Sequence, residues 1–253
     1  MSPRSIAVVT GAGSGTGRET AILLRDEGID VIGVDIDWRF DDEGVERVTG
    51  GVQDPAVWRA VRGSIEQRGG VLDRVALCAG KLAIGSVTTV AEADLRLVFE
   101  INVFGAFEAL RQLLPLMTAG GSVVAVTSID ASHAEQNLAA YSASKGALLQ
   151  LMRSVSLDYG HLGIRATAVS PGVIDTPFFQ EHVDAAADPA AFLAAKTARY
   201  PIGRILGPRE VAEVIAFVLS PRGSGISGTE IMVDGALNAG FDYQPPRPGG
   251  DAR

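Results

Sequence analysis

The chain has 253 residues, of which 47% are hydrophobic and 21% are charged, as expected for one soluble globular domain. Its net charge of −8 argues against nucleic-acid binding, and no apolar run reaches the length of a membrane span. A single cysteine and the lack of a signal-like leader favour a cytoplasmic protein without disulfides.

Short apolar runs alternate with longer amphipathic segments, which is typical of a parallel sheet covered on both faces. The predicted strands are 6–10, 31–35, 71–78, 122–127, 164–170 and 229–233, and the predicted helices are 16–28, 55–68, 92–118, 139–160 and 209–219. Asp54 and Pro55 form a helix-start signal, and Pro208 opens the last helix in the same way. We therefore predict an α/β fold, a single Rossmann-type doubly wound parallel sheet of about seven strands with helices on both faces, over residues 1–244.

Two segments fall outside this alternation. Residues 178–206 are rich in alanine and proline, and an insertion of this length is typical of a substrate-binding loop or lid. Residues 245–253 are rich in proline and glycine and are predicted to form a flexible tail.

A glycine-rich turn, Thr-Gly-Ala-Gly-Ser-Gly-Thr-Gly at 10–17, joins the first strand to the first helix. Glycine lets the backbone approach a ligand closely, and a helix N-terminus attracts negative charge. The turn is therefore predicted to hold the pyrophosphate of a dinucleotide. Its spacing differs from both the G-x-G-x-x-G and the P-loop patterns. A tight turn without a ligand is the alternative, which four glycines within seven residues make less plausible.

Asp35 ends the second predicted strand, where a carboxylate can accept hydrogen bonds from an adenosine ribose. Its charge would repel a 2′-phosphate, so the sequence favours NAD over NADP. Asp37 is the competing candidate, although its position further along the chain suits a solvated loop residue.

Tyr141 and Lys145 lie four residues apart in a predicted helix and so share one face. A phenol ordinarily loses its proton near pH 10, and a neighbouring cation lowers that pKa. A shift of two or three units takes roughly 3–4 kcal/mol, after which the tyrosine could exchange a proton with an alcohol or ketone near neutral pH. An exposed pair without function is the alternative interpretation.

Further motifs follow at regular intervals. They are Cys78-Ala79-Gly80 after a strand, Asn102 in the long helix, Ser128 at a strand end, the run from Pro171 to Pro177, and Val233-Asp234-Gly235 in the last strand. Together with the glycine turn and the Tyr141–Lys145 pair, they resemble the classical short-chain dehydrogenase/reductase family over about residues 6–235.

The resemblance implies an NAD-dependent oxidoreductase that interconverts a secondary alcohol and a ketone by hydride transfer. Tyr141 would be the general acid/base, Lys145 would lower its pKa and hold the nicotinamide ribose, Ser128 would donate to the substrate oxygen, and Asn102 would hold a water linking Lys145 to solvent. No metal is required. The other cofactor contacts would come from Gly11, Ser14, Gly15, Thr16, Gly17, Asp35, Val52, Ala79, Gly80, Pro171, Gly172, Ile174 and Thr176.

The sequence departs from the family pattern at two places. Cys78 replaces the usual asparagine, and Gly51 replaces the acidic residue that the family often places near the adenine, so we expect the Val52 backbone to contact the adenine. Ser14 and Ile36 occupy positions that are basic in NADP-preferring relatives, which again favours NAD. The alternatives are an NADPH-dependent ketoreductase, a catalytically inactive dinucleotide-binding regulator, and a dehydratase or epimerase on the same fold.

The substrate is expected to be a mainly apolar secondary alcohol or ring ketone, with sterol-like, terpenoid and aromatic alcohols all compatible. Segments 81–87, 130–138 and 178–206 should line its pocket, with apolar surface from Phe178, Phe179, Phe192, Leu193 and Tyr200, while Lys81, His133 and Glu135 either add polar selectivity or face water. The resemblance implies a homotetramer or a homodimer. The apolar residues Leu148, Leu149, Leu151 and Met152, and the segment 236–244, are expected at subunit contacts.

Overall fold

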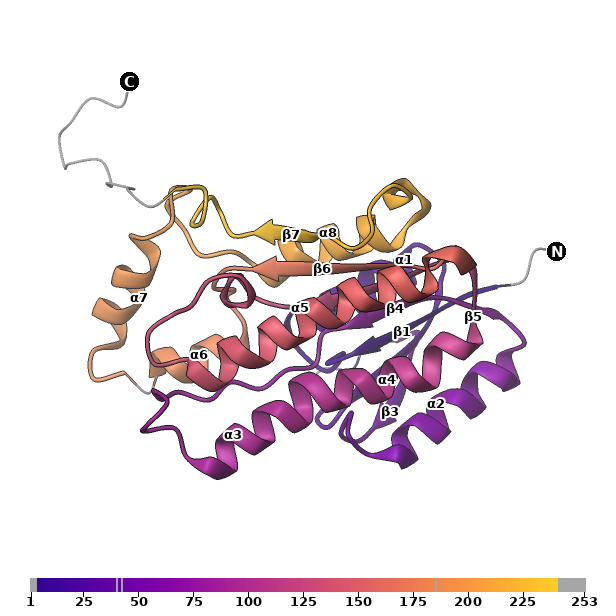
Figure 1. Cartoon of the computed structure of the whole chain (residues 1–253), viewed down its shortest axis with the longest axis horizontal. Helices are drawn as coiled ribbons and strands as arrows, with labels where there is room; N and C mark the ends of the chain where they lie inside the picture. The colour runs from indigo at the N-terminus through magenta and orange to yellow at the C-terminus, as the bar shows by residue number, and fades with distance from the viewer. Residues whose placement is uncertain (1–3, 40, 42, 185, 241–253) are drawn as a thin grey trace, which may run out of the picture.

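Seven parallel strands form one sheet in the computed structural model, which describes residues 4–39, 41, 43–184 and 186–240. The order across the sheet is β3-β2-β1-β4-β5-β6-β7, which confirms the predicted doubly wound topology (Figure 1). The strands are β1 (Ser5–Thr10), β2 (Asp30–Asp35), β3 (Val45–Thr49), β4 (Val71–Leu77), β5 (Met117–Val126), β6 (Arg165–Pro171) and β7 (Glu230–Val233).

Helices cover both faces of this sheet. The α-helices are α1 (Gly15–Asp26), α2 (Pro55–Arg68), α3 (Glu92–Phe99), α4 (Ala106–Leu113), α5 (Ala139–Tyr159), α6 (Pro177–Asp184), α7 (Pro189–Thr197) and α8 (Pro208–Leu219). α1 and α8 pack together against one face, and α2, α4 and α5 pack against the other. The predicted capping signals are confirmed, because the Asp54 side chain accepts a hydrogen bond from the Ala56 N–H and Pro208 opens α8.

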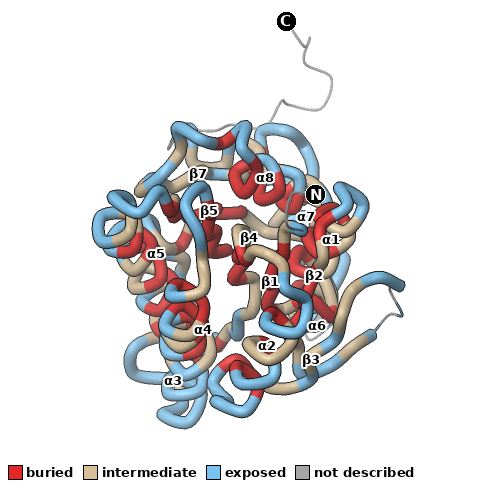
Figure 2. Tube along the Cα trace, turned by 90° about the vertical axis from the view of Figure 1, so that its right-hand side faces the viewer, coloured by how far each residue is buried: buried red, intermediate tan, exposed pale blue. Residues whose placement is uncertain are grey.

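Each face of the sheet buries its own apolar core. Ile6, Val8 and Ile32 point to the α2–α5 side, while Ala7 and Val9 point to the α1–α8 side, and all five are at most 1% exposed. Full burial of a valine or isoleucine side chain stabilises the fold by about 1.5–3 kcal/mol. Figure 2 shows this buried centre around β1, β4 and β5 and the more exposed edge at β3. The central strands are therefore a rigid platform for the loops at their carboxyl ends.

The sequence prediction missed β3. This strand has the sequence Val-Glu-Arg-Val-Thr and lies at the edge of the sheet, where its charged side chains reach solvent or ion pairs. Glu46 accepts hydrogen bonds from Ser64 and Arg68 of α2. The other strands were predicted from their apolar runs. A charged edge strand has no such run, so the same criterion could not find it.

The predicted helix at 92–118 is wrong in two respects. A π-helical segment at Glu100–Gly105 separates α3 from α4, and the helix ends in a 3₁₀ turn at Leu114–Leu116 before β5 begins at Met117. Pro115 in that turn has no N–H to continue the helix. Wider π turns of this kind occur often at functional sites, and this one contains Asn102.

The insertion predicted at 178–206 contains helices α6 and α7, which the sequence prediction left as loop. Both lie beyond the carboxyl ends of β6 and β7 (Figure 1). Asp188 caps α7 by accepting a hydrogen bond from the Ala191 N–H. Among the described residues, no helix combines the length and apolar character needed to cross a membrane.

Candidate active site

The glycine turn places an uncapped helix N-terminus at the carboxyl end of β1. Ser14 precedes α1 without a side-chain cap, and the first turn of α1 carries no acidic residue. Its backbone N–H groups therefore remain available to an anionic ligand. A Cβ on Gly17 would lie 2.1 Å from the Gly11 carbonyl oxygen, so this glycine is required by the tight turn itself. Gly15 has φ 53°, and a Cβ there would lie 3.2 Å from Thr176 Cγ2. The glycine turn and the loop after β6 therefore lie side by side.

Asp35 lies beside the glycine turn. Its Oδ2 accepts a hydrogen bond from the Gly13 N–H at 2.8 Å, and its Oδ1 accepts one from the Asp37 N–H at 3.2 Å. Asp37 lies further out, 3.5 Å from Arg39 Nε. Of the two candidate carboxylates, Asp35 is therefore the one that contacts the glycine turn.

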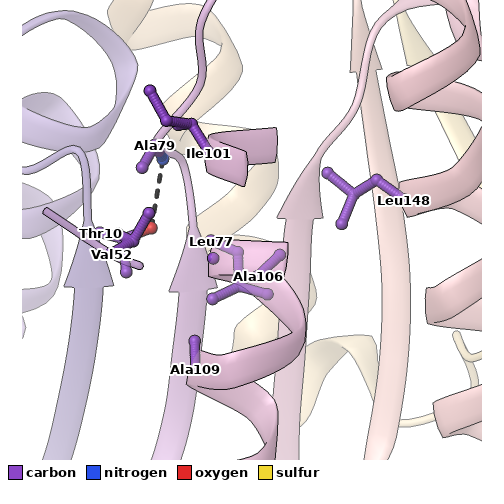
Figure 3. Close-up of a pocket in the computed structure, with 9 residues that line it drawn as sticks. Thr10, Val52, Leu77, Ala79, Ile101, Ala106, Ala109 and Leu148 are labelled. Atoms are coloured by element: carbon purple, nitrogen blue, oxygen red, sulfur yellow. Dashed lines mark hydrogen bonds between the residues drawn. The ribbon is translucent and has the colours of Figure 1, made fainter. Parts of the chain in front are cut away.

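The residues after β4 lie beside the end of β1, where Ala79 is hydrogen bonded to Thr10 (Figure 3). Thr10 Oγ1 accepts hydrogen bonds from the N–H groups of Cys78 and Ala79, each at 3.1 Å, which fixes the end of β4 against β1. Val52 is buried beside them, and its carbonyl accepts the indole N–H of Trp58. An adenine contact from the Val52 backbone would therefore use its N–H. The cavity drawn in Figure 3 has a volume of about 10 Å³, too small for an organic ligand.

Helix α5 brings Tyr141 and Lys145 together, as the spacing predicts. Lys145 Nζ lies 5.6 Å from the centre of the Tyr141 ring and donates a hydrogen bond to the Val126 carbonyl at 2.8 Å. A Cβ on Gly80 would lie 3.4 Å from Lys145 Nζ and 3.5 Å from Asn102 Oδ1. Lys145, Asn102 and Gly80 therefore meet at one point, although they are far apart in sequence.

The electrostatics of this pair differ from the sequence prediction. Burial raises the pKa of Tyr141 above its ordinary value, and the Asp130 carboxylate raises it further, while a hydrogen bond with Ser128 acts in the opposite direction. The expected lowering of the Tyr141 pKa by Lys145 is therefore not found in the protein alone, where burial and the Asp130 charge set the direction of the shift. Burial also lowers the pKa of Lys145 to about 8.

Ser128 links Tyr141 to an acidic residue that the sequence reasoning did not single out. The Ser128 hydroxyl lies 3.2 Å from Asp130 Oδ2 and accepts a hydrogen bond from the Asp130 N–H at 3.1 Å. Asp130 is 8% exposed, and burial raises the pKa of its carboxyl, as does the charge of Glu135. The only sequence signal for Asp130 is its position two residues after Ser128. Ser132, four residues further along the chain, donates its hydroxyl to Glu230.

Both polar atoms of the Asn102 side chain are hydrogen bonded to other groups of the protein. Its Oδ1 accepts from the Lys81 N–H at 2.7 Å, and its Nδ2 donates to the Lys81 carbonyl and to Ser144 Oγ, each at 2.9 Å. These bonds hold the loop after β4 against α5. A bound water at Asn102 would therefore depend on its backbone carbonyl, which lies in the π-helical segment.

The loop from Pro171 to Thr176 leaves β6 next to the glycine turn. The Gly172 N–H donates to the Val233 carbonyl, Ile174 pairs with Leu206, and Thr176 Oγ1 lies 3.4 Å from the Ile174 carbonyl. Tyr200 is 1% exposed, and its hydroxyl accepts a hydrogen bond from the Val173 N–H. The lid segment is thus anchored to the loop that carries the predicted nicotinamide contacts.

A cavity of about 90 Å³ opens next to Ser128, between the loop after β5, the lid and the turn after β7. Its lining is mostly polar, in contrast to the predicted apolar pocket: Ile129, Asp130, His133, Ala134, Glu135, Val173, Lys196, Arg199, Tyr200, Leu237 and Asn238. Of the predicted apolar lining residues only Tyr200 contributes. Phe179 is instead buried against Phe192, and Phe178 is 40% exposed. Pockets for drug-sized ligands have volumes of roughly 300–1,000 Å³, and this cavity lies well below that range.

The chain is similar to several characterised oxidoreductases. The family model described as enoyl-(acyl carrier protein) reductase matches residues 11–238. Cyclohexanol dehydrogenase of Acinetobacter sp. (strain SE19) is 30% identical, with 92% of this chain and 95% of that protein covered. Cis-4-hydroxycyclohexanecarboxylate dehydrogenase of Sinomonas cyclohexanicum is 36% identical, with 92% and 96% covered. The ligand-free aldohexose dehydrogenase of Thermoplasma acidophilum has a TM-score of 0.90 at 29% identity, with 97% of this chain and 98% of that chain covered.

Proposed function

The chain belongs to the short-chain dehydrogenase/reductase family of oxidoreductases, which bind a nicotinamide dinucleotide, and we propose that it uses NAD to interconvert a cyclic secondary alcohol and the corresponding ketone. The observation that carries this proposal is the convergence of Tyr141, Ser128 and Lys145 at the carboxyl ends of β4, β5 and β6, beside the glycine turn. A ring substrate is supported by two similar proteins, a cyclohexanol dehydrogenase and a cis-4-hydroxycyclohexanecarboxylate dehydrogenase.

The residues of the cleft fit a dinucleotide. The uncapped start of α1 would receive the pyrophosphate, Asp35 the adenosine ribose, and the loop from Pro171 to Thr176 the carboxamide. The remaining contacts would come from Gly11, Ser14, Gly15, Thr16, Gly17, Val52, Ala79, Gly80, Gly172 and Ile174. Ser14 and Ile36 offer no positive charge to a 2′-phosphate, which supports NAD over NADP. When bound, the nicotinamide accepts or supplies the hydride.

Tyr141 is proposed as the general acid/base. Its raised pKa keeps the phenol protonated near neutral pH, which suits donation of a proton to a ketone oxygen. Ser128 would donate a hydrogen bond to the same oxygen and stabilise its developing charge. In the reverse direction Tyr141 must first lose its proton, so alcohol oxidation should accelerate as the pH rises.

Lys145 is proposed to hold the nicotinamide ribose and to supply protons through Asn102. The amine is 3% exposed, hydrogen bonded to the end of β5, and its pKa of about 8 lets it exchange a proton in the working range of an enzyme. The Asn102 backbone would hold the connecting water, since its side chain is already engaged.

We further propose a homo-oligomer, a tetramer or a dimer. Phe104, in the π-helical segment Glu100–Gly105, and Phe107, in α4, lie three residues apart and are 56% and 55% exposed. Leu148, Leu149 and Met152, which the sequence suggested for subunit contacts, are buried in the core of the chain, and Phe241 and Tyr243 lie outside the described residues. The exposed rings therefore supply the apolar surface for a partner subunit.

The direct test is a panel of cyclic alcohols and ketones assayed with NAD and NADP, following the absorbance of the reduced nicotinamide. The proposal predicts turnover of a small-ring alcohol with NAD and at least tenfold lower kcat/KM with NADP. Binding of the dinucleotide without turnover of any alcohol or ketone would favour the inactive regulator instead.

A further inference from the structure

The Ser128 hydroxyl carries one proton, and in the structure it donates that proton to Asp130. Ser128 Oγ donates to Asp130 Oδ2 at 3.2 Å and accepts from the Asp130 N–H at 3.1 Å. The two residues are only 7% and 8% exposed. A hydroxyl has one donor and two acceptor lone pairs, and a carboxyl group becomes a donor when it is protonated. The protonation state of Asp130 therefore decides whether the Ser128 proton is free for another acceptor.

Tyr141 interacts with the same two residues. A hydrogen bond with Ser128 favours its phenolate form, and the charge of Asp130 disfavours it. Asp130, Ser128 and Tyr141 thus form a short hydrogen-bonded chain with a single hydroxyl in the middle. A proton can pass along such a chain when the hydroxyl rotates, because each group is both an acceptor and, once protonated, a donor.

Asp130 also lines the cavity of about 90 Å³ beside the loop after β5. This cavity has room for several water molecules, and its polar lining provides partners for them. His133 and Ala134, in the same lining, are exposed, so the cavity reaches the surface of the protein. The Asp130 carboxyl can therefore exchange a proton with water while it is hydrogen bonded to Ser128.

The charges around Asp130 oppose one another. Glu135 disfavours ionisation of the Asp130 carboxyl, whereas Lys196 of α7 and Arg199 just after it favour ionisation. Both cations also donate to Glu135, which reduces their effect on Asp130. Burial is the largest influence and raises the pKa of Asp130 above its ordinary value. A pKa moved toward neutrality suits a group that takes up and releases a proton in each turnover.

On the basis of the dehydrogenase function proposed above, we propose that Asp130 is a positioning residue that passes the Tyr141 proton to and from solvent through Ser128. In ketone reduction, Tyr141 gives its proton to the substrate oxygen while the carbonyl carbon receives the hydride. The phenolate regains a proton from Ser128 Oγ, and Ser128 takes the carboxyl proton of Asp130. Water in the cavity then protonates the Asp130 carboxylate, so each ketone reduced consumes one proton from solvent. Alcohol oxidation uses the same steps in reverse, and the route operates beside the one through Lys145.

The variant Asp130→Asn separates the first turnover from those that follow. Its amide can still form a hydrogen bond with Ser128 but cannot release a proton, whereas Tyr141 already holds the proton for the first reduction. When NADH and a cyclic ketone are mixed in a stopped-flow instrument, the first-turnover rate should stay within a few-fold of wild type. The steady-state kcat should fall by about tenfold or more, so the ratio of the two rates rises.

An unchanged ratio, whether both rates are slowed or neither is, would overturn the relay and leave the dehydrogenase function intact. A wild-type protein that reduces no ketone and oxidises no alcohol would instead contradict the dehydrogenase function itself.

Rescue by formate provides a second measurement. Asp130→Ala removes the carboxyl group from the cavity wall and leaves space that a formate ion can enter. At constant pH and ionic strength, added formate should raise the steady-state kcat of Asp130→Ala severalfold and leave that of wild type unchanged. Asp158→Ala, at an exposed residue of α5, is the matched control and should show the wild-type kcat without a response to formate. If the kcat of Asp130→Ala does not respond to formate, Asp130 has no part in proton transfer.

Discussion

Lys145 Nζ lies 5.6 Å from the centre of the Tyr141 ring and gives its hydrogen bond to the Val126 carbonyl. The ammonium is therefore near the phenol ring, and its hydrogen bond goes to the backbone of β5. The nearest polar partners of Tyr141 are Ser128, which shares a hydrogen bond with it, and the Asp130 carboxylate, which opposes its ionisation. The balance between burial, Asp130 and Ser128 sets the proton affinity of the proposed acid/base.

Removal of the Asp130 charge should shift the pH dependence of alcohol oxidation to lower pH. The carboxylate raises the Tyr141 pKa, and it is ionised in the alkaline range where a phenol titrates. In Asp130→Asn this repulsion disappears, the Tyr141 pKa falls, and the rising limb of kcat/KM should move by roughly one pH unit toward acid. The pH profile of NAD reduction measures this.

Asp158→Asn, on the exposed face of α5, removes the same charge at a remote position and should leave the profile unchanged. An unchanged or alkaline-shifted profile in Asp130→Asn would show that this carboxylate does not govern the proton of Tyr141.

Discrimination against NADP should depend on Asp35. The variant Asp35→Asn keeps the acceptor for the Gly13 N–H and removes the charge that repels a 2′-phosphate. We expect the preference for NAD over NADP to fall by about tenfold or more, equivalent to about 1.4 kcal/mol. Ratios of kcat/KM for the two cofactors measure it, and Asp37→Asn is the matched control. Loss of discrimination in the Asp37 variant alone would transfer the ribose role to that residue.

The sequence predicted the central sheet because most of β1, β2, β4, β5 and β6 consists of short, largely apolar runs, a pattern typical of buried parallel strands. The sequence also predicted that Tyr141, Lys145, Asn102 and Gly80 lie close together. The reason is that segments following the carboxyl ends of parallel strands meet at one edge of the sheet. Edge strand β3 was missed because its charged residues interrupt any apolar pattern. The break between α3 and α4 was missed because a π-helical segment leaves no mark in the apolar periodicity of a helix.

Two features of the site depend on packing and could not be read from residue order. The direction of the Tyr141 pKa depends on how deeply the ring is buried and on the Asp130 carboxylate, which folding places beside it. The polar cavity arises because the turn of Asn238 and the lid residues Lys196 and Arg199 converge on Glu135, while the lid phenylalanines turn elsewhere. Neither arrangement follows from composition.

The stability of the protein without cofactor should depend on pH through Lys145. Its folded pKa of about 8 lies below the ordinary value of 10.5, so the cost of burying the ammonium is fully present below pH 8 and disappears as the pH rises toward 10.5. Relative to Lys145→Met, the wild-type protein should therefore gain about 1 kcal/mol of unfolding free energy between pH 7 and pH 9. Urea denaturation of both proteins at the two pH values measures the difference. A difference independent of pH would contradict the lowered pKa.

The exposed rings of Phe104 and Phe107 should hold subunits together. Replacement of both by glutamate introduces charge into the proposed interface and should reduce the molar mass in solution to that of a smaller assembly. Size-exclusion chromatography with light scattering measures this. Val87→Glu, at an apolar residue that is 84% exposed away from these helices, is the control and should keep the wild-type mass. A wild-type protein that is already monomeric would refute the oligomer.

The most direct test of the central claim is the rate of NAD reduction by a small-ring alcohol in the Tyr141→Phe protein, measured together with its affinity for NAD. The proposed acid/base role predicts a kcat lower by about 10²–10⁴-fold with NAD affinity within a few-fold of wild type, since the ring is kept and only the exchangeable proton is lost. A Tyr141→Phe protein that turns over the alcohol at the wild-type rate would contradict the proposed chemistry of this site.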